Sequence, residues 1–201
     1  MKMSVLDRVL LLATGLLAAY QVAVGIDGFA TLPVIAYTIA FGILLLAGLL
    51  LIILGFEVLE EPAVAILSTL IPLSLATGLV WEYLAAYRVA FLAFSVLGFI
   101  VVLITRVLPG KGILPTVLLA IVHGVAGLSI TVLPVYLVVQ QQVEAGFVLV
   151  GMGGALIGVG GLLLSFLKTG KPLLSKDTIL KVLPGLLLLM TICYVIGFQY
   201  G

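Results

Sequence analysis

Residues 150–166 form an apolar stretch that contains six glycines and no charged residue. In a helix exposed to water, each of these glycines would cost about 1 kcal/mol relative to alanine. In lipid the backbone has no other partner for its hydrogen bonds, so a glycine-rich helix persists. Small residues recur at spacings of three, four, three and four, which places them on one helix face. The stretch predicts a membrane-spanning helix with a smooth packing face, formed by Gly151, Gly154, Gly158, Gly161 and Ser165.

The composition of the 201-residue chain excludes a soluble globular domain. Hydrophobic residues make up 64% of the chain and charged residues 8%, whereas globular domains average about 45–50% and about 25%. No polar stretch is long enough for a separate soluble domain, so we predict one polytopic membrane domain over residues 1–201. The nine basic residues are scattered among the loops, which argues against nucleic-acid binding. The single cysteine, Cys193, excludes an internal disulfide.

Apolar runs longer than about 18 residues predict membrane-spanning helices. One helix over residues 62–108 would measure about 70 Å, twice a bilayer core of about 30 Å. We therefore place a turn within residues 81–88, where a Trp, two Tyr and both charges are typical of an interface. The first run is too long for a signal peptide, whose removal would leave six spans, so we expect it to be retained. The predicted fold is an all-α integral membrane bundle of seven helices, over residues 5–24, 32–56, 62–83, 87–107, 113–139, 146–167 and 178–198.

Two of these spans carry local signals. Thr31 and Pro33 are expected to be the cap and first turn of the second span. Pro72 lies inside the third span and would free the carbonyl of Ser68, so we expect a kink there.

The distribution of lysine and arginine predicts the orientation of the bundle. With the amino terminus in the cytoplasm, eight of the nine basic residues fall on the cytoplasmic side, and only Arg88 lies outside. Such a bias in short loops sets the orientation of membrane proteins. We therefore predict a multi-pass protein of the plasma (inner) membrane, with the amino terminus cytoplasmic and the carboxyl terminus extracytoplasmic. The cytoplasmic basic residues are Lys2, Arg8, Arg106, Lys111, Lys168, Lys171, Lys176 and Lys181.

The fifth span carries a second seam of small residues, and a short turn joins it to the sixth. Small residues let two helix backbones approach closely where lipid provides no hydrophobic drive between helices. We expect the fifth and sixth spans to pack tightly along both seams, although glycines in such a position could instead admit a ligand or let a helix slide. The seam of the fifth span is formed by Ala120, Gly124, Gly127 and Thr131.

His123 is the one ionisable residue near the middle of a span, which makes it a candidate functional residue. The alternative is a neutral imidazole bonded to a neighbouring hydroxyl or to a carbonyl freed by a proline. A single histidine cannot form a bis-histidine haem site, and no Cys, Asp or Glu at that depth completes a zinc site, so we predict neither metal nor cofactor. The candidate intramembrane polar site is His123 with Ser74, Thr77, Ser95, Thr116 and Thr191.

The acidic residues all lie near the predicted interfaces, which disfavours a carboxylate-dependent coupled pump. Glu82 and Arg88 could form an outer ion pair or be separately solvated. Nucleophile-elbow, zinc-protease and phosphate-loop signatures are missing from the sequence. We therefore lean against an enzyme.

Three functional hypotheses remain. The first is a non-enzymatic multi-pass protein: a subunit of a membrane complex, or a module that binds a lipid or a small apolar ligand. Its expected partners are membrane lipids, and other membrane proteins or further copies of the chain are alternatives. The second is a small-solute transporter or channel with His123 lining the route. The third is a lipid-acting membrane enzyme that depends on His123.

Overall fold

The computed structural model describes residues 3–108, 114–168 and 174–201, without the side chains of Ala65 and residues 165–168. Within these residues, seven helices are long and apolar enough to cross a membrane. They contain 20 to 26 residues, which corresponds to about 30–39 Å at 1.5 Å per residue. Each helix begins and ends within two residues of a predicted span, and residues 169–173 between the sixth and seventh spans lie outside the described residues. The helices are α1 (Val5–Val24), α2 (Thr31–Leu54), α3 (Pro62–Tyr83), α4 (Arg88–Val107), α5 (Leu114–Val139), α6 (Val148–Lys168) and α7 (Lys176–Gly197).

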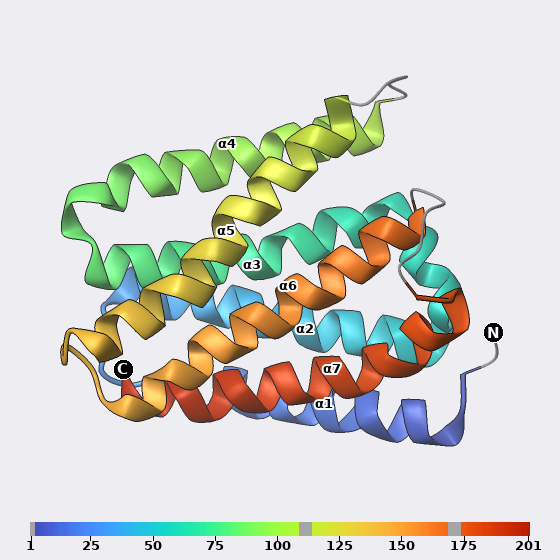
Figure 1. Ribbon diagram of the computed structural model, residues 1–201, viewed down its shortest axis with the longest axis horizontal. Helices are drawn as coiled ribbons and strands as arrows, with labels where there is room; N and C mark the ends of the chain where they lie inside the picture. Colours follow the sequence, from blue (N-terminus) through green and yellow to red (C-terminus); the bar gives the residue numbers. More distant parts are fainter. Residues whose placement is uncertain (1–2, 109–113, 169–173) are drawn as a thin grey trace.

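Consecutive helices run in opposite directions, and the two chain ends lie at opposite ends of the bundle (Figure 1). α1 packs between α2 and α7, and α3 contacts α2, α4 and α5. α6 contacts α5 and α7. The α4–α5 hairpin forms one edge of the bundle (Figure 1). α3 and α4 are joined by the 3₁₀ helix Ala85–Tyr87 within the predicted turn, and three further 3₁₀ helices are Phe56–Glu60, Ala145–Phe147 and Phe198–Tyr200.

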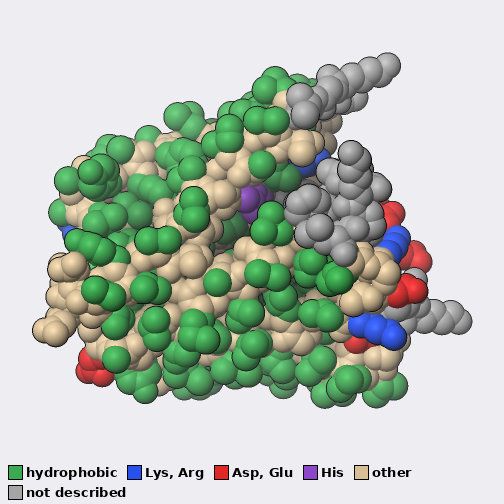
Figure 2. All heavy atoms as spheres, viewed as in Figure 1, with side chains coloured by type: hydrophobic (Ala, Val, Ile, Leu, Met, Phe, Trp, Pro, Cys, Tyr) green, Lys and Arg blue, Asp and Glu red, His purple; other side chains and the backbone are tan. Residues whose placement is uncertain are grey.

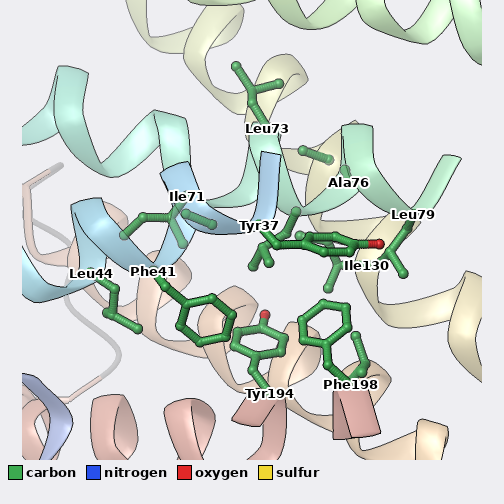
Figure 3. Packing of buried hydrophobic residues seen from close by; sticks show 14 of the residues in the cluster. Tyr37, Phe41, Leu44, Ile71, Leu73, Ala76, Leu79, Ile130, Tyr194 and Phe198 are labelled. Carbon is green, nitrogen blue, oxygen red and sulfur yellow. The ribbon is translucent and has the colours of Figure 1, made fainter. Parts of the chain in front are cut away.

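The core near the carboxyl-terminal end is built from aromatic rings around Phe198. The centroid of its ring lies 4.4 Å from that of Tyr37 and 6.3 Å from that of Tyr194 (Figure 3). Both tyrosine rings lie directly over glycines, Tyr37 over Gly78 of α3 and Tyr194 over Gly153 of α6. A Cβ atom at Gly153 would approach Cε1 of Tyr194 to 2.6 Å. These two glycines therefore make room for large rings inside the bundle.

Long-range contacts fix the ends of the helices. The N-cap of α2 is Ala30, and its backbone N–H donates to the Glu82 carboxylate at 3.1 Å. Thr31 is therefore the first helical residue and not the expected cap, because Glu82 at the end of α3 supplies the acceptor. Arg88 donates to the Trp81 carbonyl and lies over the Trp81 ring, so in the described structure Glu82 and Arg88 each bond to a backbone group and not to one another. At the opposite end, Lys176 and Glu60 form an exposed ion pair of 3.1 Å.

Candidate functional site

α5 and α6 are in close contact at the end where the turn joins them. A Cβ atom at Gly151 would lie 2.8 Å from the carbonyl oxygen of Thr131, a backbone atom of α5. A Cβ atom at Gly154 would lie 2.8 Å from Cγ2 of Ile130 and 2.9 Å from Oγ1 of Thr131. In this half of the two seams the helix backbones approach as closely as glycine permits, as small residues allow in membranes.

The other half of the seams is open. A Cβ atom at Gly124, Gly127, Gly158 or Gly161 would meet nothing within 4 Å. By spacing, these glycines lie on the same helix faces that touch farther along, at Thr131 and Gly154. The two helices therefore separate along their length, as Figure 1 shows. We call the space between these four glycines the α5–α6 wedge.

We expected α5 and α6 to pack along the whole of both seams, and the wedge shows that this prediction is wrong for half of their length. The physical reason is that α5 packs against α4 on the face opposite its glycine seam. Val122 and Ala126 of α5 are buried, and a Cβ atom at Gly98 of α4 would lie 3.1 Å from Cγ2 of Val122. α5 thus follows α4 over the half of its length where it leaves α6. At the far end of the seams Ala120 is exposed, and the side chain of Ser165 lies outside the described residues.

His123 lies on the α5 wall of the wedge. It follows Ala120 by three residues and precedes Gly127 by four, so the three share one helix face. Figure 2 shows the histidine side chain, in purple, recessed between neighbouring helices. Nδ1 lies 3.2 Å from the carbonyl oxygen of Leu119. Because a carbonyl only accepts, Nδ1 is the donor and Nε2 of the neutral ring is left as an acceptor.

In the described part of the chain the partner of Nδ1 is therefore a carbonyl of its own helix, not a hydroxyl of a neighbouring span or a carbonyl freed by a proline. Pro134, the proline inside α5, would free the carbonyl of Ile130, and Nδ1 instead bonds to Leu119. Thr116, two turns from His123, is exposed. His123 and Thr116 thus share a helix face and are joined by no described hydrogen bond.

The other four hydroxyl residues of the predicted polar site are buried. Thr77 of α3 and Ser95 of α4 lie within hydrogen-bonding distance, 2.7 Å between their oxygens, and Thr77 also donates to the Leu73 carbonyl at 2.6 Å. Ser74 donates to the Leu70 carbonyl of its own helix, and Thr191 to the Leu187 carbonyl at 2.7 Å. The structure thus joins Thr77 to Ser95, while the hydroxyls of Ser74 and Thr191 bond to carbonyls of their own helices. None of these four hydroxyls is bonded to His123 in the described contacts.

Arg106 is a residue that the sequence reasoning used only as a signal of orientation. It occupies the last turn of α4 and is partly buried. Its Nε atom is fully buried and has no hydrogen-bond partner in the described part of the chain. The buried residues of α4 are Ser95, Gly98 and Val102, and Arg106 continues this stripe by four residues, a periodicity that could have indicated its burial.

Two further buried polar atoms lie in the aromatic core. The hydroxyl oxygens of Tyr37 and Tyr194 have no hydrogen-bond partner among residues 3–108, 114–168 and 174–201. Figure 3 shows the Tyr194 hydroxyl between the rings of Phe41 and Phe198. The surroundings are apolar, and a narrow cavity there is lined by Ala40, Phe41, Leu44, Ile71, Leu75 and Tyr194. These tyrosines serve the packing of the core.

Metal binding finds no support in the described residues, where no group of three or more His, Cys, Asp or Glu side chains could hold an ion. No family model matches the chain, and neither does any curated protein or solved structure. By composition and helix length the chain is a multi-pass, membrane-like helical protein. What it does must be argued from the wedge.

Proposed function

We propose that this protein is a non-enzymatic multi-pass membrane protein that holds a lipid chain in the α5–α6 wedge. Its amino terminus is cytoplasmic and its carboxyl terminus extracytoplasmic, in the plasma (inner) membrane. The placement of eight of nine basic residues supports this orientation, because consecutive helices run in opposite directions (Figure 1).

The observation that carries the proposal is the open half of the glycine seams. Gly158 and Gly161 are exposed, and none of the four wedge glycines has a neighbouring atom where a side chain would begin. Two glycine-lined helix faces that separate in this way leave a slot between backbones. A protein helix has a diameter of about 10–12 Å with its side chains, whereas a lipid chain is much thinner. A chain can therefore enter the narrow part of such a slot.

The length of the slot also suits a lipid chain. From Thr116 to Gly127 the α5 wall covers eleven residues, or about 16 Å at 1.5 Å per residue. That is about half of a bilayer core of about 30 Å, so a chain from one leaflet can follow it. Moving a lipid chain from the bilayer into the slot brings little hydrophobic free energy, because both surroundings are apolar. Selectivity must therefore come from close packing against the glycines and from polar groups near the opening.

A transport route through the bundle receives less support from the described contacts. Four of the five hydroxyl residues expected to line it are buried and bonded to helix carbonyls or to each other, the exception being Thr116. Side chains that conduct a solute through the membrane face a wetted cavity. Gly158 and Gly161 of the wedge, by contrast, are exposed at the surface of the bundle.

The test is to fill the wedge with a side chain and measure retained lipid. Gly158→Leu introduces a large side chain where nothing lies within 4 Å of the new Cβ, and Gly42→Leu on α2 is the matched control, since its Cβ also meets open space. Native mass spectrometry of the gently extracted full chain should show lipid bound to the wild type and to Gly42→Leu, and about tenfold less bound to Gly158→Leu. Equal lipid retention by all three proteins would refute the proposal, and a protein partner lost in place of lipid would show that the wedge is a docking site.

A further inference from the structure

Six of the seven spanning helices form a closed ring around the interior of the bundle. Each contacts the next in the order α1, α2, α3, α5, α6, α7 and back to α1, while α4 lies outside against α3 and α5 (Figure 1). The interior of this ring holds the narrow cavity of the aromatic core, and all six of its lining residues are buried. The cavity is too narrow to admit a water molecule. The ring therefore encloses empty space that water does not fill.

Tyr194 supplies the polar atom of this cavity. Its side chain is 1% exposed, and its hydroxyl lies between the rings of Phe41 and Phe198 (Figure 3). Within the described residues that hydroxyl has no hydrogen-bond partner, which is unfavourable for a buried donor. Water cannot supply the missing partner while the cavity keeps this width. A partner for Tyr194 must therefore come with a rearrangement that widens the cavity.

Phe198 is the side chain whose movement would widen it. The centroid of its ring lies 4.4 Å from that of Tyr37 and 6.3 Å from those of Phe41 and Tyr194. Phe198 belongs to the short 3₁₀ helix Phe198–Tyr200 that follows α7, and not to a spanning helix. We call this short helix the plug. Because it lies beyond the end of α7, the plug can move while the six-helix ring stays in place.

The outer end of the plug is held by contacts at the surface of the bundle. The backbone N–H of Glu144 donates to the carbonyl oxygen of Tyr200 at 3.2 Å. The Tyr200 ring lies against Gly146, where a Cβ atom would come within 2.4 Å of its Cγ atom. Tyr200 is 37% exposed, and exposed contacts at the end of an element are among the first to open in a folded protein. The plug thus has a buried inner end at Phe198 and a solvent-accessible outer end at Tyr200.

We propose that the plug closes a second binding site, separate from the α5–α6 wedge, whose ligand is a small apolar carbonyl compound. The apolar body of the ligand takes the place of the Phe198 ring, and its carbonyl oxygen accepts from the Tyr194 hydroxyl. A carbonyl suits this position because it accepts a hydrogen bond and has no donor of its own to satisfy. The other lining residues are apolar, so a further polar group on the ligand would be buried without a partner.

The experiment compares two probes of the same shape, para-fluoroacetophenone and the para-fluorostyrene in which a methylene group replaces the carbonyl oxygen. Each is titrated onto the purified full chain in detergent and followed by fluorine NMR, in which saturation distinguishes a site from partition into the micelle. The wild type should bind the ketone about fivefold tighter than the styrene. Tyr194→Phe keeps the ring over Gly153 and removes the hydroxyl, so it should bind both probes equally.

A second pair of variants tests the plug. Phe198→Ala removes the ring that competes with the ligand, so it should bind the ketone about tenfold tighter than the wild type. Phe56→Ala is the matched control, because Phe56 is a buried phenylalanine in the other hydrophobic cluster of the bundle. Phe56→Ala should bind the ketone as the wild type does.

Several results would overturn the inference. Absence of saturable ketone binding to the wild type refutes the site, even if Phe198→Ala binds, because the cavity would then be a product of the substitution. A ketone preference that Tyr194→Phe keeps refutes the role of the hydroxyl. An equal gain in affinity for Phe56→Ala and Phe198→Ala refutes the role of the plug. None of these results bears on lipid retention by Gly158→Leu, so this inference and the proposed function fail separately.

Discussion

Replacing Gly151 with alanine would place a methyl group 2.8 Å from the carbonyl oxygen of Thr131, which is 0.6 Å short of ordinary contact at 3.4 Å. The obstructing atom belongs to the α5 backbone and cannot rotate away, so α6 must move off α5. Overpacking of this kind costs about 1–3 kcal/mol. Alanine also favours the helix by up to about 1 kcal/mol relative to glycine. The net result for Gly151→Ala is a loss of up to about 2 kcal/mol of unfolding free energy.

The matched control is Gly158, which lies two turns farther along the same face of α6. Gly158→Ala receives the same gain in helix propensity, but its new Cβ meets no atom within 4 Å. We therefore expect Gly158→Ala to be neutral or to stabilise the protein by up to about 1 kcal/mol. The difference between the two variants, about 1–3 kcal/mol, then reports the backbone contact alone.

The single cysteine provides the assay. Cys193 is 5% exposed and lies on α7, so a thiol-reactive dye labels it only when the bundle opens. Thermal labelling curves in detergent should give a lower midpoint for Gly151→Ala than for the wild type, by about 2–4 °C for each kcal/mol lost. The Gly158→Ala midpoint should equal or exceed that of the wild type. Equal midpoints for both variants would refute the close contact at Gly151, and a lower midpoint for Gly158→Ala would refute the open wedge.

Two further predictions concern buried hydroxyls. Thr77→Val should lower the unfolding free energy, because it leaves the Ser95 hydroxyl buried without its partner at 2.7 Å, and a double-mutant cycle with Ser95→Ala should give a coupling of about 0.6–1.7 kcal/mol. A coupling of zero in equilibrium unfolding would contradict the α3–α4 hydrogen bond. Tyr194→Phe removes a buried hydroxyl that lacks a partner in the described structure, so the thermal midpoint should stay the same or rise. A clear fall in that midpoint would show that the hydroxyl is satisfied by a bound molecule.

The spans could be predicted from the sequence because their boundaries depend on local chemistry. Hydrophobic length and the interfacial residues over 81–88 placed α3 and α4 on either side of a turn that the structure contains. Capping was harder to predict, because the acceptor for the Ala30 N–H is 52 residues away in Glu82. The pattern of small residues identified the α5 and α6 faces, but not how far along them the helices remain in contact. The length of that contact depends on how Val122 of α5 packs against Gly98 of α4.

The candidate site was only partly visible in the sequence for the same reason. His123 stood out as an ionisable residue inside an apolar run. Arg106 did not, because an arginine at the end of a span is ordinarily a solvated topology signal. Its burial depends on α4 presenting the Ser95–Gly98–Val102 stripe to the bundle, which is a tertiary property. Gly153 likewise lies outside the predicted seam. Its contact with the Tyr194 ring depends on the packing of α7 against α6, which the sequence does not show.

The contact at Gly151 and Thr131 also makes α5 a lever. Seventeen residues separate Thr131 from Leu114 at the start of the helix, an arm of about 25 Å at 1.5 Å per residue. A rotation of only about 5° at the pivot moves the free end by about 2 Å, more than the slack that a close-packed interior would permit. Small changes at one end of the bundle are thus enlarged at the other, and the width of the wedge depends on the angle at which α5 crosses the contact between Gly151 and the Thr131 carbonyl.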